Sequence, residues 1–285
     1  MTDFSEVAGY ALFYTKQLAS KLKAKVEVMH ILGTPVDWVR LDKDKEKFYP
    51  ETLNAIANAK SNLSSIVHDL EKQGINALSS LIYSFGSETV FEHVQNAEPD
   101  LVIMGSEGRG AKKPFYLGST AQKVLRNIKT PILIVKEEPA HKEIKKIAFL
   151  STLEKSQKPI FKKLKKLADL LGAQLDLIFI NTPYDFHESA EIDEMFNEML
   201  ESDNTTQHFL INAKDAENGV IYYAENNQPD ILTLAKTEKS GLTKFFNPSL
   251  TENLAKTHNF PILSICLEEW IASSRKIWLN GRIRE

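Results

Sequence analysis

The chain has 285 residues, 42% of them hydrophobic and 26% charged, and a formal net charge of −3 at pH 7. These values are typical of a globular protein of one large or two ordinary domains, and they exclude a disordered or fibrous chain. The small net charge gives no general field that would favour nucleic acid, and no apolar run approaches the roughly 20 residues that span a bilayer.

The first half of the chain alternates short apolar runs with amphipathic segments. A long helix is predicted over residues 52–73, because its pattern ends at Gly74 as a helix stop should. A short helix is predicted over 86–96, with Ser87 as its cap. The predicted strands of this half cover residues 26–32, 78–83, 99–104 and 130–135.

The second half repeats these elements in the same order. Helices are predicted over 159–171 and 219–225. A Pro-Asp pair opens the run 99–104, and the matching run 228–234 has the same pair one residue after its start. The predicted strands cover residues 146–150, 174–180, 207–212, 228–234 and 260–265. Such alternation indicates an α/β fold of two tandem, doubly wound, mainly parallel sheets of the five-stranded type, with helices on both faces.

The domain limits follow from this repeat. We predict a first domain over residues 1–138, a second over 143–269 and a C-terminal extension over 270–285. The linker at 136–142 contains proline and charged residues. In parallel sheets of this kind, ligands bind at the carboxyl ends of the strands.

A glycine-rich loop follows the strand at 99–104. It places Gly105, Gly108 and Gly118 at fixed spacings, with Ser119 and Thr120 opening the next helical pattern. Glycines let the backbone approach an anion closely, and the free N–H groups and dipole of a helix start favour negative charge. A strand, this loop and a helix therefore predict a phosphate site, whereas a plain surface loop is the alternative.

The spacing Gly-x2-Gly-x9-Gly-Ser resembles the nucleotide-binding motif of the universal stress protein family, and the resemblance covers about residues 1–269. It implies a Rossmann-like, adenine nucleotide alpha hydrolase-like fold that binds ATP, with Mg²⁺ as an accompanying ion. Asp3 is implied to hold the adenosine, Ile31 to frame the adenine and Arg109 to reach a phosphate, with a solvated arginine as the alternative. The implied nucleotide-binding residues are Asp3, Ile31, Met104, Gly105, Gly108, Arg109, Gly118, Ser119 and Thr120.

One strand of the family pattern has no counterpart in the first half. The family has a hydrophobic strand before the Asp-Phe-Ser segment, and the second half has it at 147–150, but this sequence starts at residues 1–5. Its absence would leave backbone groups on two neighbouring strands unpaired. Either the start is truncated or misassigned, or another segment fills the gap. Residues 276–279 are one candidate filler, and a solvent-exposed basic tail is the alternative for that end.

The loop of the second half is degraded. Ala235 and Glu238 replace the first two glycines, and Pro248-Ser249 replaces Gly-Ser. Glu238 would put a carboxylate where phosphate should lie, and Pro248 lacks an N–H to donate. We therefore expect nucleotide in the first domain only.

No residue pattern predicts catalysis or a metal site. The seven histidines lack metal-ligand spacing, and no base is placed to activate water. We expect a stress-responsive, ATP-binding regulatory protein, with a slow ATPase or a nucleotide-free structural protein as the alternatives. The lone Cys266 and the absence of a signal-peptide pattern favour the cytoplasm.

The expected assembly comes from the last strand of each half. The apolar strands at 132–135 and 262–265 would have an unpaired outer edge, and such edges are usually covered. The family resemblance implies that the two halves pair there as an internal pseudo-dimer, with a homodimer as a further option. Two separate domains on the linker are the alternative.

Overall fold

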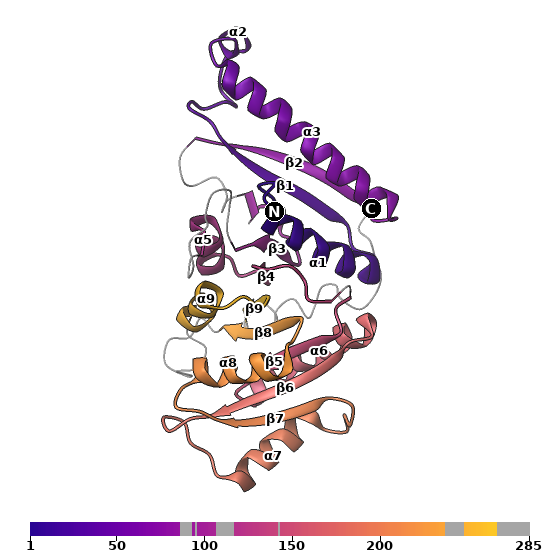
Figure 1. The fold of residues 1–285 in the computed structure, drawn as a ribbon, viewed down its shortest axis with the longest axis vertical. Helices are drawn as coiled ribbons and strands as arrows, with labels where there is room; N and C mark the ends of the chain where they lie inside the picture. Colours follow the sequence, from indigo (N-terminus) through magenta and orange to yellow (C-terminus); the bar gives the residue numbers. More distant parts are fainter. Residues whose placement is uncertain (86–92, 95, 107–116, 142, 237–247, 267–285) are drawn as a thin grey trace. The chain divides into compact units, whose positions relative to one another are not determined.

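The computed structural model describes residues 1–85, 93, 94, 96–106, 117–141, 143–236 and 248–266 (Figure 1). The chain divides into two compact units: Met1–Ile128 with Ile134–Pro139, and Lys129–Leu133 with Ala140–Glu285. The chain changes from one unit to the other after Ile128, after Leu133 and after Pro139.

The first unit contains a long helix packed on a pair of parallel strands. Strands β1 and β2 form a two-stranded sheet of their own, in a register that runs from Val26↔Ala77 to Gly33↔Ser84. Strand β3 belongs to a separate sheet, in which its neighbour is β4. The elements of this unit are α1 (Glu6–Leu22), β1 (Val26–Gly33), α2 (Lys43–Glu46), α3 (Pro50–Lys72), β2 (Ala77–Ser84), β3 (Val102–Gly105) and α5 (Ser119–Asn127). Strand β4 (Ile132–Val135) is divided, because its last two residues belong to this unit and its first two to the other.

Local sequence explains where the two long helices begin and end. Ser5 caps α1 by accepting a hydrogen bond from the Ala8 N–H at 3.2 Å, and Lys23 ends the helix in the left-handed region. Helix α3 starts at Pro50, whose missing N–H is not needed at a first helical position, and Gly74 follows its end at φ 74°. The helix expected over 52–73 is thereby confirmed, whereas the sequence did not reveal α1.

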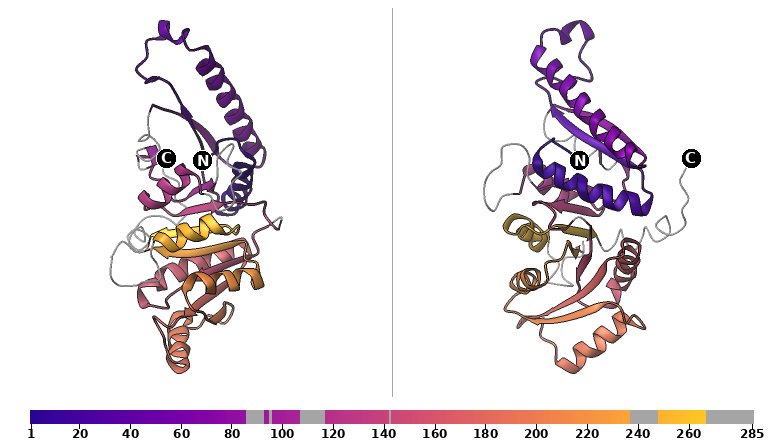
Figure 2. Two further views of the ribbon diagram at one scale, coloured as in Figure 1. Left: turned by 60° about the vertical axis from the view of Figure 1, so that its left-hand side comes forward. Right: turned by 45° about the vertical axis from the view of Figure 1, so that its right-hand side comes forward.

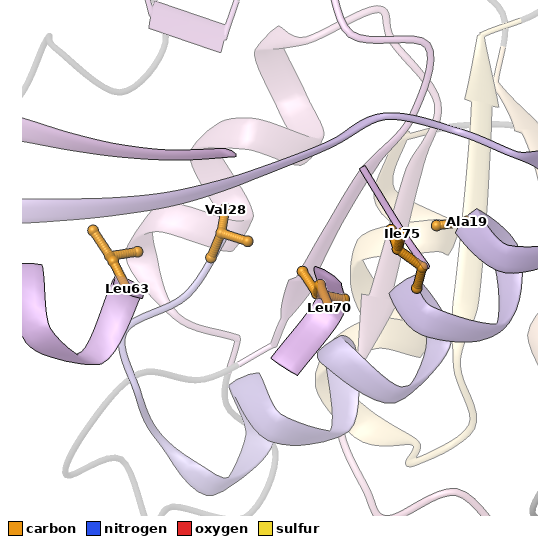
Figure 3. Packing of buried hydrophobic residues seen from close by; sticks show 5 residues of the cluster. All are labelled: Ala19, Val28, Leu63, Leu70 and Ile75. Atoms are coloured by element: carbon orange, nitrogen blue, oxygen red, sulfur yellow. The ribbon is translucent and has the colours of Figure 1, made fainter. Parts of the chain in front are cut away.

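The core of the first unit joins α1, α3 and β1 (Figure 3). Ala19 of α1, Val28 of β1, Leu63 and Leu70 of α3, and Ile75 form one buried cluster. Burying a leucine side chain contributes about 1.5–3 kcal/mol. Both helices therefore bury side chains against β1, while α3 also packs on β2 and α1 on β3.

The second unit is a complete doubly wound sheet. Its strands follow the order β9-β8-β5-β6-β7, and all four neighbouring pairs of these strands are parallel, which confirms the expected fold class. Its elements are β5 (Lys146–Leu150), α6 (Lys158–Leu171), β6 (Gln174–Asn181), α7 (Ser189–Leu200), β7 (Gln207–Asn212), α8 (Ala216–Asn227), β8 (Ile231–Lys236), α9 (Pro248–Thr257) and β9 (Ile262–Cys266). The right-hand view of Figure 2 shows α6 and α8 on opposite sides of this sheet.

Strand β5 lies at the centre of the second unit. It pairs with β6 along one edge and with β8 along the other, and Ile147, Ala148 and Phe149 are completely buried. The carboxylate of Asp230 anchors its start by accepting the N–H groups of Lys145 and Lys146, at 2.8 and 2.9 Å. A central strand with both edges paired is thus what completes this sheet.

A buried polar pair joins β6 and α8 in the second unit. Asp176 of β6 is completely buried, and its carboxylate accepts hydrogen bonds from the Tyr223 hydroxyl and from Gln174 Nε2, the latter at 2.6 Å. Burial and then the hydrogen bond to this carboxylate raise the pKa of Tyr223 well above its usual range. Tyr223 lies on α8, so this hydrogen bond ties α8 to β6. Breaking it would be costly, because it would leave a buried polar group unpaired.

Candidate functional site

The first residues of the chain run between the ends of β1 and β3. The Met1 amino group donates to the Ile103 carbonyl at 2.7 Å, and the Thr2 N–H donates to the Met29 carbonyl at 2.8 Å. The Thr2 carbonyl in turn lies 2.8 Å from Nδ1 of His30. These contacts place the residue that follows, Asp3, beside the carboxyl ends of both strands.

Asp3 is half-buried and held locally. Its Oδ1 accepts the Ser5 N–H at 3.1 Å and the Ser5 hydroxyl at 2.6 Å, while Ser5 itself caps α1. Phe4, at φ 62°, turns the chain sharply into that helix, and its ring lies 4.4 Å from the His30 ring, centroid to centroid. Ile31, the next residue of β1, is half-buried at the same end of the strand. The structure therefore brings the two residues expected at the adenosine close in the fold.

Gly105 ends β3 against the first turn of α1. A Cβ atom at this position would lie 2.9 Å from Val7 Cγ1, 3.3 Å from the Val7 carbonyl carbon and 3.4 Å from the Ala8 nitrogen. The preceding Met104 is buried. Glycine is therefore required here because α1 approaches β3 closely. The loop motif had suggested a different reason, the close approach of an anion.

Ser106 links the end of β3 to the start of α5. Its N–H donates to the Val135 carbonyl and its carbonyl accepts from the Gly118 N–H, both at 2.7 Å. Its Oγ is completely buried and has no hydrogen-bond partner among the described residues. Sequence reasoning missed this residue, although its place directly after Gly105 in the glycine loop was a usable signal.

Helix α5 begins at the candidate phosphate site without a side-chain cap. Gly118 takes the cap position at φ −55°, and because glycine has no side chain, the cap residue itself cannot accept the first N–H groups of the helix. No acidic residue lies in the first turn, and Ser119 and Thr120 are exposed. Uncapped N–H groups and the helix dipole together make such a start suitable for an anion.

Two of the expected site residues cannot be placed. Gly108 and Arg109 lie outside the described residues, as do Lys112 and Lys113. The other seven, Asp3, Ile31, Met104, Gly105, Gly118, Ser119 and Thr120, are described.

The second unit repeats the turn but not the loop. Leu153 has φ 60°, matching Phe4, and the Ser151 N–H donates to the Ile178 carbonyl at 2.9 Å, as Thr2 donates to Met29. This match makes Thr152 the counterpart of Asp3. At the loop, Ala235 is buried and α9 begins at Pro248, which has no N–H, while Glu238 lies outside the described residues.

The N-terminal amino group is an unusual part of this region. It is buried, and desolvation lowers its pKa from 8.0 to about 6, against the opposing effect of Glu27. Within the described ranges, no group of three or more His, Cys, Asp or Glu side chains is arranged to hold a metal ion. None of the helices in the described part of the chain is long and apolar enough to cross a membrane.

A parallel, doubly wound sheet with a glycine loop leading into an uncapped helix belongs to the α/β proteins of the nucleotide-binding type. A model of the universal stress protein family matches residues 1–136. The universal stress protein MJ0577 of Methanocaldococcus jannaschii is 27% identical over 149 residues, which cover 48% of this chain and 92% of that protein. In the comparison with its solved structure the identity is 30%, over 48% of this chain and 92% of that chain, with a TM-score of 0.40.

A second solved structure covers nearly the whole chain. A universal stress protein from Archaeoglobus fulgidus aligns over 93% of this chain and 96% of that chain, with a TM-score of 0.70 and 16% identity. This likeness shows the fold of both halves. On the family model and the MJ0577 match, the chain belongs to the universal stress protein family.

Proposed function

We propose that the first unit binds one adenine nucleotide, ATP, and that the protein is a stress-responsive regulatory binder of the cytoplasm. The observation that carries the proposal is the uncapped start of α5, which the Gly118–Ser106 hydrogen bond of 2.7 Å joins to the end of β3. An anion there would meet free N–H groups and the positive end of the helix dipole.

Each expected residue takes a distinct role in this proposal. The N–H groups that follow Gly118 and the hydroxyls of Ser119 and Thr120 donate to phosphate oxygens, and Gly108 and Arg109 complete the loop. Asp3 and Ile31 lie where the adenosine would sit, next to Met104 and Gly105. Mg²⁺ would be held through phosphate oxygens and water, as that ion prefers.

The second unit is proposed to bind no triphosphate. Its equivalent helix, α9, starts at Pro248, so one donor is missing, and the buried methyl group of Ala235 replaces a glycine. Calorimetry of the full chain with Mg-ATP is expected to give a stoichiometry near one. A value of two would contradict the proposed difference between the units.

A single charge tests the helix start directly. Ser119 and Ser189 are both exposed first residues of helices, α5 and α7, so S119D and S189D form a matched pair. In either variant the aspartate at the helix N-terminus interacts favourably with the helix dipole and is expected to stabilise the helix by about 0.3–1 kcal/mol. A carboxylate about 4 Å from a phosphate charge costs roughly 1–4 kcal/mol, so S119D is expected to weaken ATP binding at least about fivefold. Equal affinities in the two variants would contradict the proposed phosphate position.

A slow ATPase is the second candidate, and the same geometry argues against fast turnover. The one expected carboxylate of the site, Asp3, is engaged with Ser5 and belongs to the adenosine end. Phosphoryl transfer also needs an oriented nucleophile. Bound ATP is therefore expected to persist for many minutes in single-turnover assays. Turnover near the ordinary range of roughly 1–1000 per second, lost on substitution of Ser119, would make the protein an enzyme.

A nucleotide-free structural protein is the third candidate, and the nucleotide content of the purified protein distinguishes it from the other two. The internal pseudo-dimer of the two halves stays a prediction. Small-angle scattering that showed two independently moving domains would contradict it.

A further inference from the structure

Strand β2 lies at the edge of the small sheet in the first unit. Among the described strands β1 is its one neighbour (Figure 1). Each residue of a parallel strand directs its N–H and C=O groups to the same side, and the side alternates along the strand. The Thr34 N–H donates to the Ser84 carbonyl at 2.9 Å, so the even-numbered residues of β2 direct these groups to β1. The odd-numbered residues direct theirs outward, and they are Ala77, Ser79, Leu81 and Tyr83.

These outward backbone groups form an open edge. In the described part of the chain, no hydrogen bond outside the β1–β2 ladder involves the backbone of residues 77, 79, 81 or 83. Such a row of N–H and C=O groups is a template for pairing with another strand, and proteins usually blunt it with lysine, proline or a bulge. β2 has no charged residue and no proline, and its register with β1 is continuous over all eight residues. The edge is therefore fit to accept a further strand.

The sequence of β2 is complementary to itself in one antiparallel register. When Ser80 lies opposite Ser80 of a second copy, residue 77 lies opposite 83 and residue 79 opposite 81. Outward residues then face outward residues, and each such pair exchanges both of its N–H···O bonds. Every outward backbone group of both strands therefore finds a partner.

The side chains on the α3 side of the strand also fit in this register. Ala77 and Leu81 pack there against the buried cluster of the first unit. Small residues lie opposite large ones, since Ala77 meets Tyr83 of the second copy and Ser79 meets Leu81. Two large side chains never compete for the same space on this face of the joined strands.

On the other face of the strand, apolar residues meet apolar ones. Leu78 lies opposite Ile82 of the second copy, and the two Ser80 side chains meet each other. Cross-strand apolar pairs and hydroxyl pairs both stabilise sheets, whereas like charges directly opposite each other destabilise them. Self-pairing places every charge of a strand near its own copy, and β2 carries none. A second copy of the chain is thus the occupant that matches this edge along its whole length.

We propose that two copies of the chain associate through β2, paired antiparallel about a twofold axis at Ser80. The two small sheets then form one sheet in the order β1-β2-β2-β1, parallel within each copy and antiparallel at the junction. Such a contact uses the same surface on both copies, so it closes at a dimer and uses up the open edge of β2 in each.

Proline at Ser79 tests the pairing. The Ser79 N–H points away from β1, so S79P removes one donor from each copy and keeps the ladder with β1, a position at which proline is tolerated. We expect the full wild-type chain to sediment as a reversible dimer, and S79P to raise its dissociation constant at least about fivefold.

L210P is the matched control. Leu210 is exposed on β7, the edge strand of the second unit. The Ala213 N–H donates to the Asn181 carbonyl at 3.1 Å, so even-numbered residues of β7 direct their N–H groups outward. L210P therefore removes an outward donor from the other edge strand, and it is expected to dimerise as the wild type does.

A cysteine at the twofold axis tests the register. Residues directly opposite each other in a non-hydrogen-bonded pair have Cα atoms about 4.5 Å apart, within the range that a disulfide spans. S80C is therefore expected to form a covalent dimer on mild oxidation. In S84C, a cysteine on the same face of β2 would lie about 26 Å from its copy, so no covalent dimer is expected. The native Cys266 is buried, and the wild-type chain gives the background.

Three results would overturn the proposal. One is a wild-type chain that sediments as a monomer at every concentration. Another is a dimer that S79P leaves as strong as the wild type, or that L210P weakens equally, because a different surface would then hold the two copies. The third is equal crosslinking of S80C and S84C. If circular dichroism shows that S79P is unfolded, the two cysteine variants decide the question by themselves.

Discussion

Replacing Gly105 with alanine tests how closely α1 must approach β3 for the candidate site to form. The new Cβ would lie 2.9 Å from Val7 Cγ1, and the backbone of Val7 and Ala8 lies only 3.3–3.4 Å away. Valine is stiff at χ1 in a helix, so its methyl group cannot turn away freely. The first turn of α1 must therefore shift outward, and with it Ser5 and Asp3.

The expected cost follows from these distances. Overpacking by one methyl group costs about 1–3 kcal/mol, and Gly105 is not at positive φ, so alanine adds no backbone strain. The smaller unfolded-state entropy of alanine offsets about 0.4–1 kcal/mol. G105A is thus expected to lose about 1–2 kcal/mol of stability, and to weaken ATP binding because Asp3 moves.

Urea denaturation and calorimetry with Mg-ATP measure the two effects. The double variant V7A/G105A is expected to recover about 1 kcal/mol relative to the sum of the single variants. G9A is the control within α1: Gly9 is exposed with no atom within 4 Å of an added Cβ, so alanine is expected to stabilise the helix by about 0.5–1 kcal/mol. G219A, whose Cβ would meet Ile180 at 2.6 Å, should destabilise the second unit without weakening ATP binding. A G105A variant as stable as the wild type, or one that gains nothing from V7A, would contradict the close contact between Gly105 and the first turn of α1.

Two further predictions concern buried polar groups. Burial lowers the pKa of the Met1 amino group from 8.0 to about 6, so between these values the unfolded state binds more protons than the folded state. Stability is therefore expected to rise by roughly 2–3 kcal/mol from pH 6 to pH 8, measured by urea denaturation, and N-terminal acetylation should remove this rise. Y223F leaves the buried Asp176 carboxylate with one donor fewer and is expected to cost about 2–3 kcal/mol in the second unit. A loss under about 0.5 kcal/mol would mean that the hydroxyl is not a significant donor.

Much of the fold is readable from the sequence because its signals are local. Strands such as β6 and β9 are short apolar runs between turn residues, and α3 shows a helical period closed by Gly74. Helices α1 and α7 were missed for different reasons. The apolar residues of α1 are too evenly spread around the helix to give a clear stripe, and the acidic start of α7 is equally typical of a solvated loop.

The glycine loop and the repeat could be determined from the sequence alone, since fixed spacings and a twofold pattern need no neighbours in space. Contacts between segments that lie far apart in the sequence could not be determined in this way. That Gly105 must admit α1, that Ser106 holds Gly118, and that Asp230 anchors β5 became visible only in the folded chain. Each depends on which residues the parallel sheet brings side by side, and that juxtaposition is a property of strand order and register rather than of any local pattern.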